Sequence, residues 1–183
     1  MRLGVTGLAA FLAASVASAA LAATSVNGDL KLTPFNPQTG CKFSPTTTKL
    51  ALGPIAAGSH VLLAQCGGAA GPRGSFTGSP ATKGAGYGWN WYLAVGKNGK
   101  MTGVAAEYGT AVLLPTSGTQ ITLSLTGVQE PIGPQTSTHA KGLTKGTWNA
   151  LTGGKGSGTY TFTTERTGSI FTTATLHLQG SIR

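Results

Sequence analysis

The strongest constraint on this chain is the alternation of apolar and polar residues in its last segment. Between residues 170 and 182 the even positions are mostly apolar, as at Leu176 and Leu178, and the odd positions mostly polar, as at Thr175 and His177. A period of two indicates a β-strand with one buried face and one face in water. Residues 159–164 alternate in the same way. A short segment ending in glycine joins the two runs, so we predict an antiparallel hairpin.

Similar patterns recur along the chain and define the expected fold class. Strands are predicted at residues 29–33, 49–52, 59–66, 86–95, 101–108, 110–114, 119–126 and 146–151. Few windows are rich in helix formers, and Thr, Val, Ile, Tyr and Phe favour strands. The sequence therefore predicts an all-β fold, a single antiparallel β-barrel or β-sandwich of about 8–10 short strands. Residues 67–86, rich in glycine, are predicted to be a mobile loop.

The first 22 residues have the pattern of a targeting segment. Arg2 is followed by an uncharged run of apolar and small residues, and residues 17–19 and 20–22 both fit the A-x-A cleavage rule. A membrane-spanning helix is the alternative, since about 20 uncharged residues suffice. The two cleavage patterns and the lack of a following basic cluster favour a signal peptide at 1–22 and a single domain at 23–183. We expect an exported protein in the extracellular space, the periplasm or the cell surface.

Two cysteines, Cys41 and Cys66, are present in the whole sequence. An even pair in an exported chain predicts a disulfide. The alternatives are two free thiols or a two-ligand metal site, and the pair has no Cys-x-x-Cys spacing.

The charge of the chain is strongly positive but scattered. The chain has thirteen lysines and arginines and four acidic residues, which gives a net charge of +9. There is neither a basic run nor a nucleic-acid motif, so no nucleic-acid partner is expected. A polysaccharide or an anionic envelope polymer is the expected partner, the polymer held weakly and in a salt-dependent way. Most of the predicted strands are shorter than the about 9–11 residues of a lipid-facing barrel, and aromatic residues are only 7% of the chain, so no membrane span is expected after cleavage.

Titratable groups are too few to predict an active site. The chain has three histidines and the acids Asp29, Glu107, Glu130 and Glu165, without triad, carboxylate-pair or metal-ligand spacing. The glycine-rich run at 153–158 lacks P-loop spacing and precedes a strand. We therefore expect no catalytic residue, metal or cofactor.

The aromatic residues are the ligand-binding candidates. Trp89 and Trp91 share one face of their predicted strand, Tyr92 lies on the other, and Trp148 is elsewhere in the chain. They either pack in the core or form an exposed platform or barrel-mouth pocket for sugar rings or an apolar ligand.

Residues 146–161 and 176–182 join a short strand, a glycine-rich turn and a final hairpin. This ending resembles that of secreted bacterial β-proteins of unknown function and is similar to small barrels of the dirigent and allene oxide cyclase type. The aromatic-bearing insertion of that turn is missing between Gly154 and Gly156, and no catalytic residue of those families has a counterpart here. The resemblance implies only the barrel architecture.

Together these features predict a secreted or envelope-associated, non-enzymatic β-domain that acts by binding or assembly. The expected roles are surface interaction, carbohydrate binding, or self-association by strand addition at an exposed edge. The alternative is a small β-barrel enzyme or a carrier for an apolar small molecule.

Overall fold

The structure is a computed structural model that describes residues 23–183 except 50, 52, 54, 68–72 and 137. The predicted signal peptide lies outside the described residues. The described residues form ten strands and one four-residue helix, in the order β1 (Thr24–Leu32), α1 (Pro37–Gly40), β2 (Cys41–Thr47), β3 (His60–Cys66), β4 (Arg73–Ser79), β5 (Thr82–Val95), β6 (Met101–Pro115), β7 (Ile121–Pro131), β8 (His139–Thr152), β9 (Gly156–Thr167) and β10 (Ile170–Ile182).

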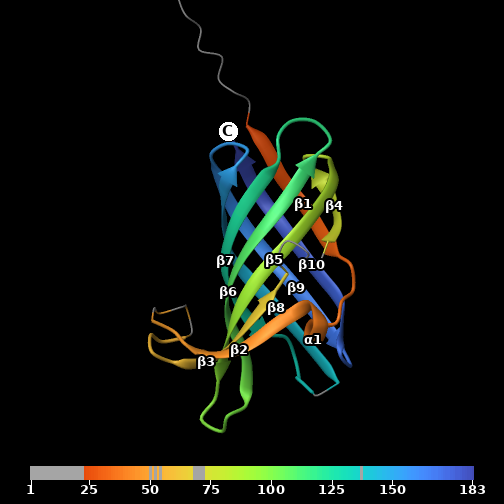
Figure 1. Ribbon diagram of the computed structural model, residues 1–183. Helices are drawn as coiled ribbons and strands as arrows, with labels where there is room; N and C mark the ends of the chain where they lie inside the picture. Colours follow the sequence, from red (N-terminus) through yellow and green to blue (C-terminus); the bar gives the residue numbers. More distant parts are fainter. Residues whose placement is uncertain (1–22, 50, 52, 54, 68–72, 137) are drawn as a thin grey trace, which may run out of the picture.

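The sheet closes into a barrel. Its strand order is β2-β3-β5-β4-β1-β10-β9-β8-β7-β6, and β6 pairs again with β5, so all strands except β2 and β3 form a ring (Figure 1). All the ladders are antiparallel. β4 pairs with the first half of β5, and β3 pairs with its second half. The β2–β3 hairpin therefore extends from the ring, and β2 is the last strand of the sheet on that side.

The predicted alternation sets which side chains fill the barrel. In the β9–β10 hairpin, Leu176 pairs with Phe162, and both side chains are fully buried. His177, which follows Leu176 in β10, is exposed on the outer face. The all-β prediction and the hairpin prediction are confirmed.

Large rings inside the barrel pack on glycines of neighbouring strands. A Cβ at Gly180 would lie 2.4 Å from Trp148 Cζ2, and one at Gly109 would lie 2.4 Å from the Tyr87 hydroxyl oxygen. The interior of an eight-stranded barrel is just wide enough for side chains. At Gly180 and Gly109 the neighbouring ring occupies the space that a side chain would need.

The predicted loop at 67–86 is wrong for most of its length, because β4 and the first part of β5 occupy it. Phe76 of β4 is buried and pairs with Leu30 of β1. The glycines that suggested a loop allow close strand contact, since a Cβ at Gly78 would lie 2.2 Å from the Asn27 carbonyl oxygen.

Other strand predictions also change. Segments 101–108 and 110–114 form one strand, β6, and β2 was not predicted. Residues 49 and 51 are outside any strand, and the rest of the predicted 49–52 strand includes positions outside the described residues.

The disulfide prediction is confirmed. Cys41 and Cys66 are directly paired across β2 and β3, with an S–S distance of 2.02 Å. Within the described part of the chain, no helix has the length and hydrophobicity needed to cross a membrane.

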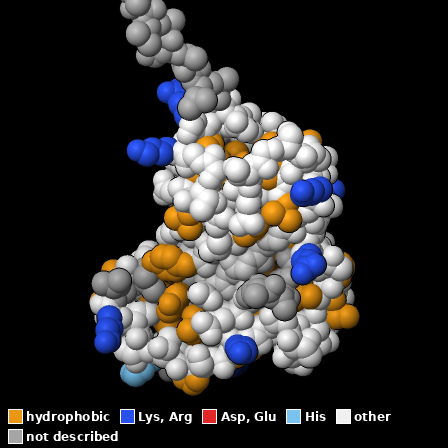
Figure 2. Space-filling model, turned by 45° about the horizontal axis from the view of Figure 1, so that its top comes forward, with side chains coloured by type: hydrophobic (Ala, Val, Ile, Leu, Met, Phe, Trp, Pro, Cys, Tyr) orange, Lys and Arg blue, Asp and Glu red, His pale blue; other side chains and the backbone are white. Residues whose placement is uncertain are grey.

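The two ends of the barrel differ. We call the end at which β5, β7 and β9 finish the lower end, and the end with the chain terminus Arg183 the upper end (Figure 1). On the face shown in Figure 2, apolar side chains form separate small patches, and the lysine and arginine side chains stand apart from one another.

Candidate functional site

A pocket of about 680 Å³ opens at the lower end of the barrel. Six ring strands and β2 contribute to its wall. The apolar part of the lining includes Phe43, Trp91, Leu93, Met101 and Phe171. The polar part includes Gln129, Lys141, Thr164 and Arg166. We call this space the lower pocket.

Aromatic rings lie behind the lower pocket. Trp91 is 5.9 Å from Phe171 and 5.4 Å from Trp89, measured between ring centroids. Phe35 and Phe162 extend the same cluster around Trp89. These rings form one packed aromatic cluster, of which Trp91 and Phe171 also line the lower pocket.

Glu107 is the one acidic side chain that is buried among the described residues, and it lies in the middle of the barrel. Its carboxylate accepts hydrogen bonds from Tyr87 Oη at 2.7 Å, Trp91 Nε1 at 2.5 Å, Thr144 Oγ1 at 2.9 Å and Tyr160 Oη at 3.2 Å. Four donors from three other strands converge on one carboxylate. The arrangement satisfies the carboxylate and ties β5, β8 and β9 to β6.

Burial governs the protonation of this group. Desolvation raises the pKa of Glu107, and the hydrogen bonds from Tyr87, Thr144, Trp91 and Tyr160 oppose the rise. Desolvation and the Glu107 charge raise the pKa of both Tyr87 and Tyr160. The two tyrosines therefore stay protonated and act as donors.

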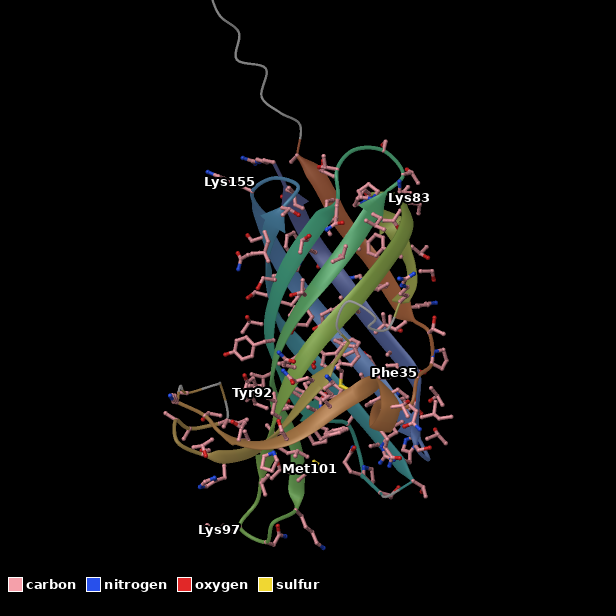
Figure 3. The ribbon with its side chains drawn as sticks, in the orientation of Figure 1. Phe35, Lys83, Tyr92, Lys97, Met101 and Lys155 are labelled. Carbon is pink, nitrogen blue, oxygen red and sulfur yellow. A yellow bond between two sulfur atoms is a disulfide. The ribbon has the colours of Figure 1, made fainter. Side chains whose placement is uncertain are left out.

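The predicted ligand-binding residues lie in different surroundings. Trp89 and Trp148 are 2% and 0% exposed, Trp148 far from the lower pocket among the glycines of β9 and β10. Trp91, 6% exposed, lines the lower pocket. Tyr92 points out of the barrel and packs on Tyr108, with ring centroids 6.0 Å apart (Figure 3). The three tryptophans therefore do not form an exposed platform, and Trp91 is the predicted residue that a pocket ligand can reach.

Histidines and the remaining acids lie at the surface. His177 Nδ1 is 2.7 Å from Asp29 Oδ1 across β10 and β1, with both side chains 46% exposed. His139 and Lys141 each lie 3.8 Å from Glu165. Among the described residues, no group of three or more His, Cys, Asp or Glu could hold a metal ion.

Sequence reasoning missed several residues of this region. Phe171 and Phe43 were not candidates, and neither were Glu107 and Gln129. The burial of Gln129 could have been predicted from the alternation along β7. Gln129 has an odd number, like the inward-facing Leu123 and Leu125 of the same strand. In the same way, Glu107 alternates in step with Ala105 and Ala111, which face the interior from β6.

A second hollow, of about 970 Å³, runs over the outer face of β5 and β6. Its lining includes Gly84, Gly86 and Gly88. Gly67 and Arg73 also line it, and the segment that joins them lies outside the described residues.

No protein-family model, curated protein or solved structure matches this chain. The resemblance to dirigent and allene oxide cyclase barrels stays a prediction.

Proposed function

We propose that this protein is a non-enzymatic binding barrel that takes a small molecule with an apolar body into its lower pocket. The observation that carries the proposal is the pocket itself. Its volume of about 680 Å³ falls within the roughly 300–1,000 Å³ typical of small-molecule sites. Its lining combines aromatic and aliphatic side chains with a few polar groups, as such sites usually do.

Exposed apolar side chains at the pocket support this function. Phe43 is 48% exposed and Met101 is 59% exposed, although both are large and apolar. Met101 lies at the lower end of the barrel, near the hairpin that carries Lys97 (Figure 3). Covering these two side chains with an apolar ligand would remove their surface from water, which is favourable.

The placement of the acidic and aromatic residues favours binding of a small molecule over sugar stacking or catalysis. Trp89 and Trp148 are enclosed by protein atoms, so a sugar ring cannot stack on them. Glu107 is fully buried and its carboxylate already accepts four hydrogen bonds.

We further propose that the protein acts outside the cytoplasm, in the cell envelope or beyond it. The leader-like first 22 residues and the Cys41–Cys66 disulfide support this location, since disulfides persist in oxidising compartments. Lys83 and Lys155 lie at the upper end and Lys97 at the lower end (Figure 3). Cations at both ends favour weak, salt-dependent attraction to anionic envelope polymers.

The binding function is tested with a neutral fluorescent probe, N-phenyl-1-naphthylamine, titrated into the full folded domain. We expect saturable binding that Phe43→Ala weakens about tenfold, because the ring supplies apolar contact area. Leu151→Ala is the matched control, since Leu151 is 61% exposed and does not line the pocket. Failure of the probe to bind, or equal weakening by Leu151→Ala, would overturn the proposal.

A further inference from the structure

We infer that the ligand of the lower pocket is an amphipathic anion, an apolar body with one acidic group that binds at Arg166. The inference rests on the proposed binding function and adds the chemical class of the ligand. It identifies Arg166 as the residue that selects that class.

Arg166 lies on the inner face of β9, next to the last residue of that strand. It follows the buried Phe162 and Thr164 in steps of two, and successive side chains of a strand point to opposite faces. Its ladder partners are Ala140 of β8 and Phe171 of β10, and all three residues line the pocket. Arg166 is partly exposed, so a ligand in the pocket can reach its side chain.

Backbone carbonyl groups hold the guanidinium at the rim of the pocket. Arg166 Nη2 donates to the Thr136 carbonyl oxygen at 3.2 Å, and Nη1 donates to the Gly168 carbonyl oxygen. Thr136 and Gly168 are exposed, and both line the pocket. Neutral carbonyl groups orient the guanidinium without cancelling its charge, which therefore acts on the occupant of the pocket.

The charged residues around the pocket favour an anion. Lys141 also lines it, whereas none of the acidic residues that the structure describes does so. The nearby Glu165 lies on the opposite face of β9 from Arg166, where its carboxylate oxygens are 3.8 Å from Lys141 Nζ and from His139 Nε2. Glu165 therefore offsets the charge of Lys141, and Arg166 supplies positive charge on the pocket side.

Apolar side chains lie directly beside this cation. Phe171 pairs with Arg166 in the β9–β10 ladder and packs on Trp91, with ring centroids 5.9 Å apart. An apolar body can cover these rings while a carboxylate, sulfonate or phosphate accepts charge-assisted hydrogen bonds from the guanidinium. The pocket thus matches a molecule that carries both parts.

The test compares two fluorescent probes that differ by one acidic group, N-phenyl-1-naphthylamine and 8-anilinonaphthalene-1-sulfonate. We expect the folded wild-type domain to bind the sulfonate about tenfold more tightly than the neutral probe. Arg166→Gln should weaken binding of the sulfonate about tenfold and change the affinity for the neutral probe by less than about twofold.

Lys97→Gln is the matched control, because it removes one positive charge at the same end of the barrel (Figure 3). Lys97 is exposed and does not line the pocket. At physiological salt this variant should change the affinity for either probe by less than about twofold, since exposed charges are screened.

Each outcome bears on one of the two proposals. If neither probe binds, the binding function is overturned. If both probes bind the wild type equally, the pocket takes apolar molecules and the anionic class is overturned. If Lys97→Gln weakens the sulfonate about tenfold, the net charge of the protein sets the preference and the role of Arg166 is overturned. The wild-type comparison and Lys97→Gln decide the inference even where Arg166→Gln does not fold.

Discussion

Glu107 shows at the scale of one residue how a barrel interior can hold a charged group. A buried carboxylate is unfavourable unless its oxygens are hydrogen-bonded. Here Tyr87, Trp91, Thr144 and Tyr160 supply the donors. Removing the acceptor would leave these donors unpaired in the core, so we regard Glu107 as an organising residue of the fold.

The raised pKa of Glu107 predicts a pH dependence of stability. The native state holds the proton more tightly than the unfolded chain, whose carboxyl has a pKa near 4.5. The Glu107 contribution to the free energy of unfolding is therefore fully present below pH 4.5 and is lost as the pH rises through the native pKa. Glu107→Gln does not titrate at this position, so the difference between wild type and variant isolates the effect.

Urea unfolding of both proteins from about pH 4 to pH 8 measures this difference. We expect the wild type to lose stability relative to Glu107→Gln as the pH rises. A difference that is constant, or that grows with pH in favour of the wild type, would show that the hydrogen bonds outweigh desolvation.

Gly109 predicts a second residue-scale effect, because Tyr87 lies directly over it. A Cβ there would be 2.4 Å from the Tyr87 hydroxyl oxygen. We expect Gly109→Ala to destabilise the protein by about 1–3 kcal/mol through overpacking. Gly84→Ala is the matched control in the paired strand, since its Cβ would meet only Leu114 at 3.6 Å. Equal stability of the two variants, measured by urea unfolding, would contradict the packing argument.

At the scale of elements, the β2–β3 hairpin is the part of the sheet least integrated with the ring. Among the described strands, β2 pairs only with β3, and the disulfide links the first residue of β2 to the last of β3. The two cysteines are 25 residues apart, and closing a loop of this length stabilises by up to about 3–4 kcal/mol in the chain-entropy model.

The double variant Cys41→Ala/Cys66→Ala should release this hairpin before the barrel. We expect faster hydrogen exchange in β2 and β3 and unchanged exchange in β9 and β10. Probe binding should weaken as well, because Cys41 and Phe43 line the lower pocket. A similar rise of exchange in β9 and β10 would show that hairpin and barrel unfold as one unit.

The elements also show what the sequence could and could not predict. The β9–β10 hairpin was predictable because its inner positions are apolar at Tyr160, Phe162, Leu176 and Leu178. β4 was not, because glycines alternate with polar residues there and only Phe76 indicates a buried face. The site was predicted only through Trp91, since a pocket depends on strands that are distant in the chain.

At the scale of the whole molecule, closure determines how the protein can unfold. β1 pairs with both β4 and β10, and β5 pairs with β6 as well as with β3 and β4. Every ring strand thus has partners on both edges. Opening the ring at one ladder exposes backbone groups and the apolar interior together, so partial opening is unfavourable.

We therefore expect a single cooperative transition, and the tryptophans can report it from two places. Trp148 packs against the glycines of β9 and β10. Trp91 lines the lower pocket, and Trp89 packs against Trp91 behind it. Trp148→Phe leaves only the lower reporters. Urea midpoints from tryptophan fluorescence and from far-UV circular dichroism should coincide in wild type and in this variant. In Trp148→Phe the fluorescence midpoint could instead shift away from the dichroism midpoint. That result would mean that the two ends of the barrel unfold separately. In that case the pairing of β5 with β6 would not hold the ring as one unit.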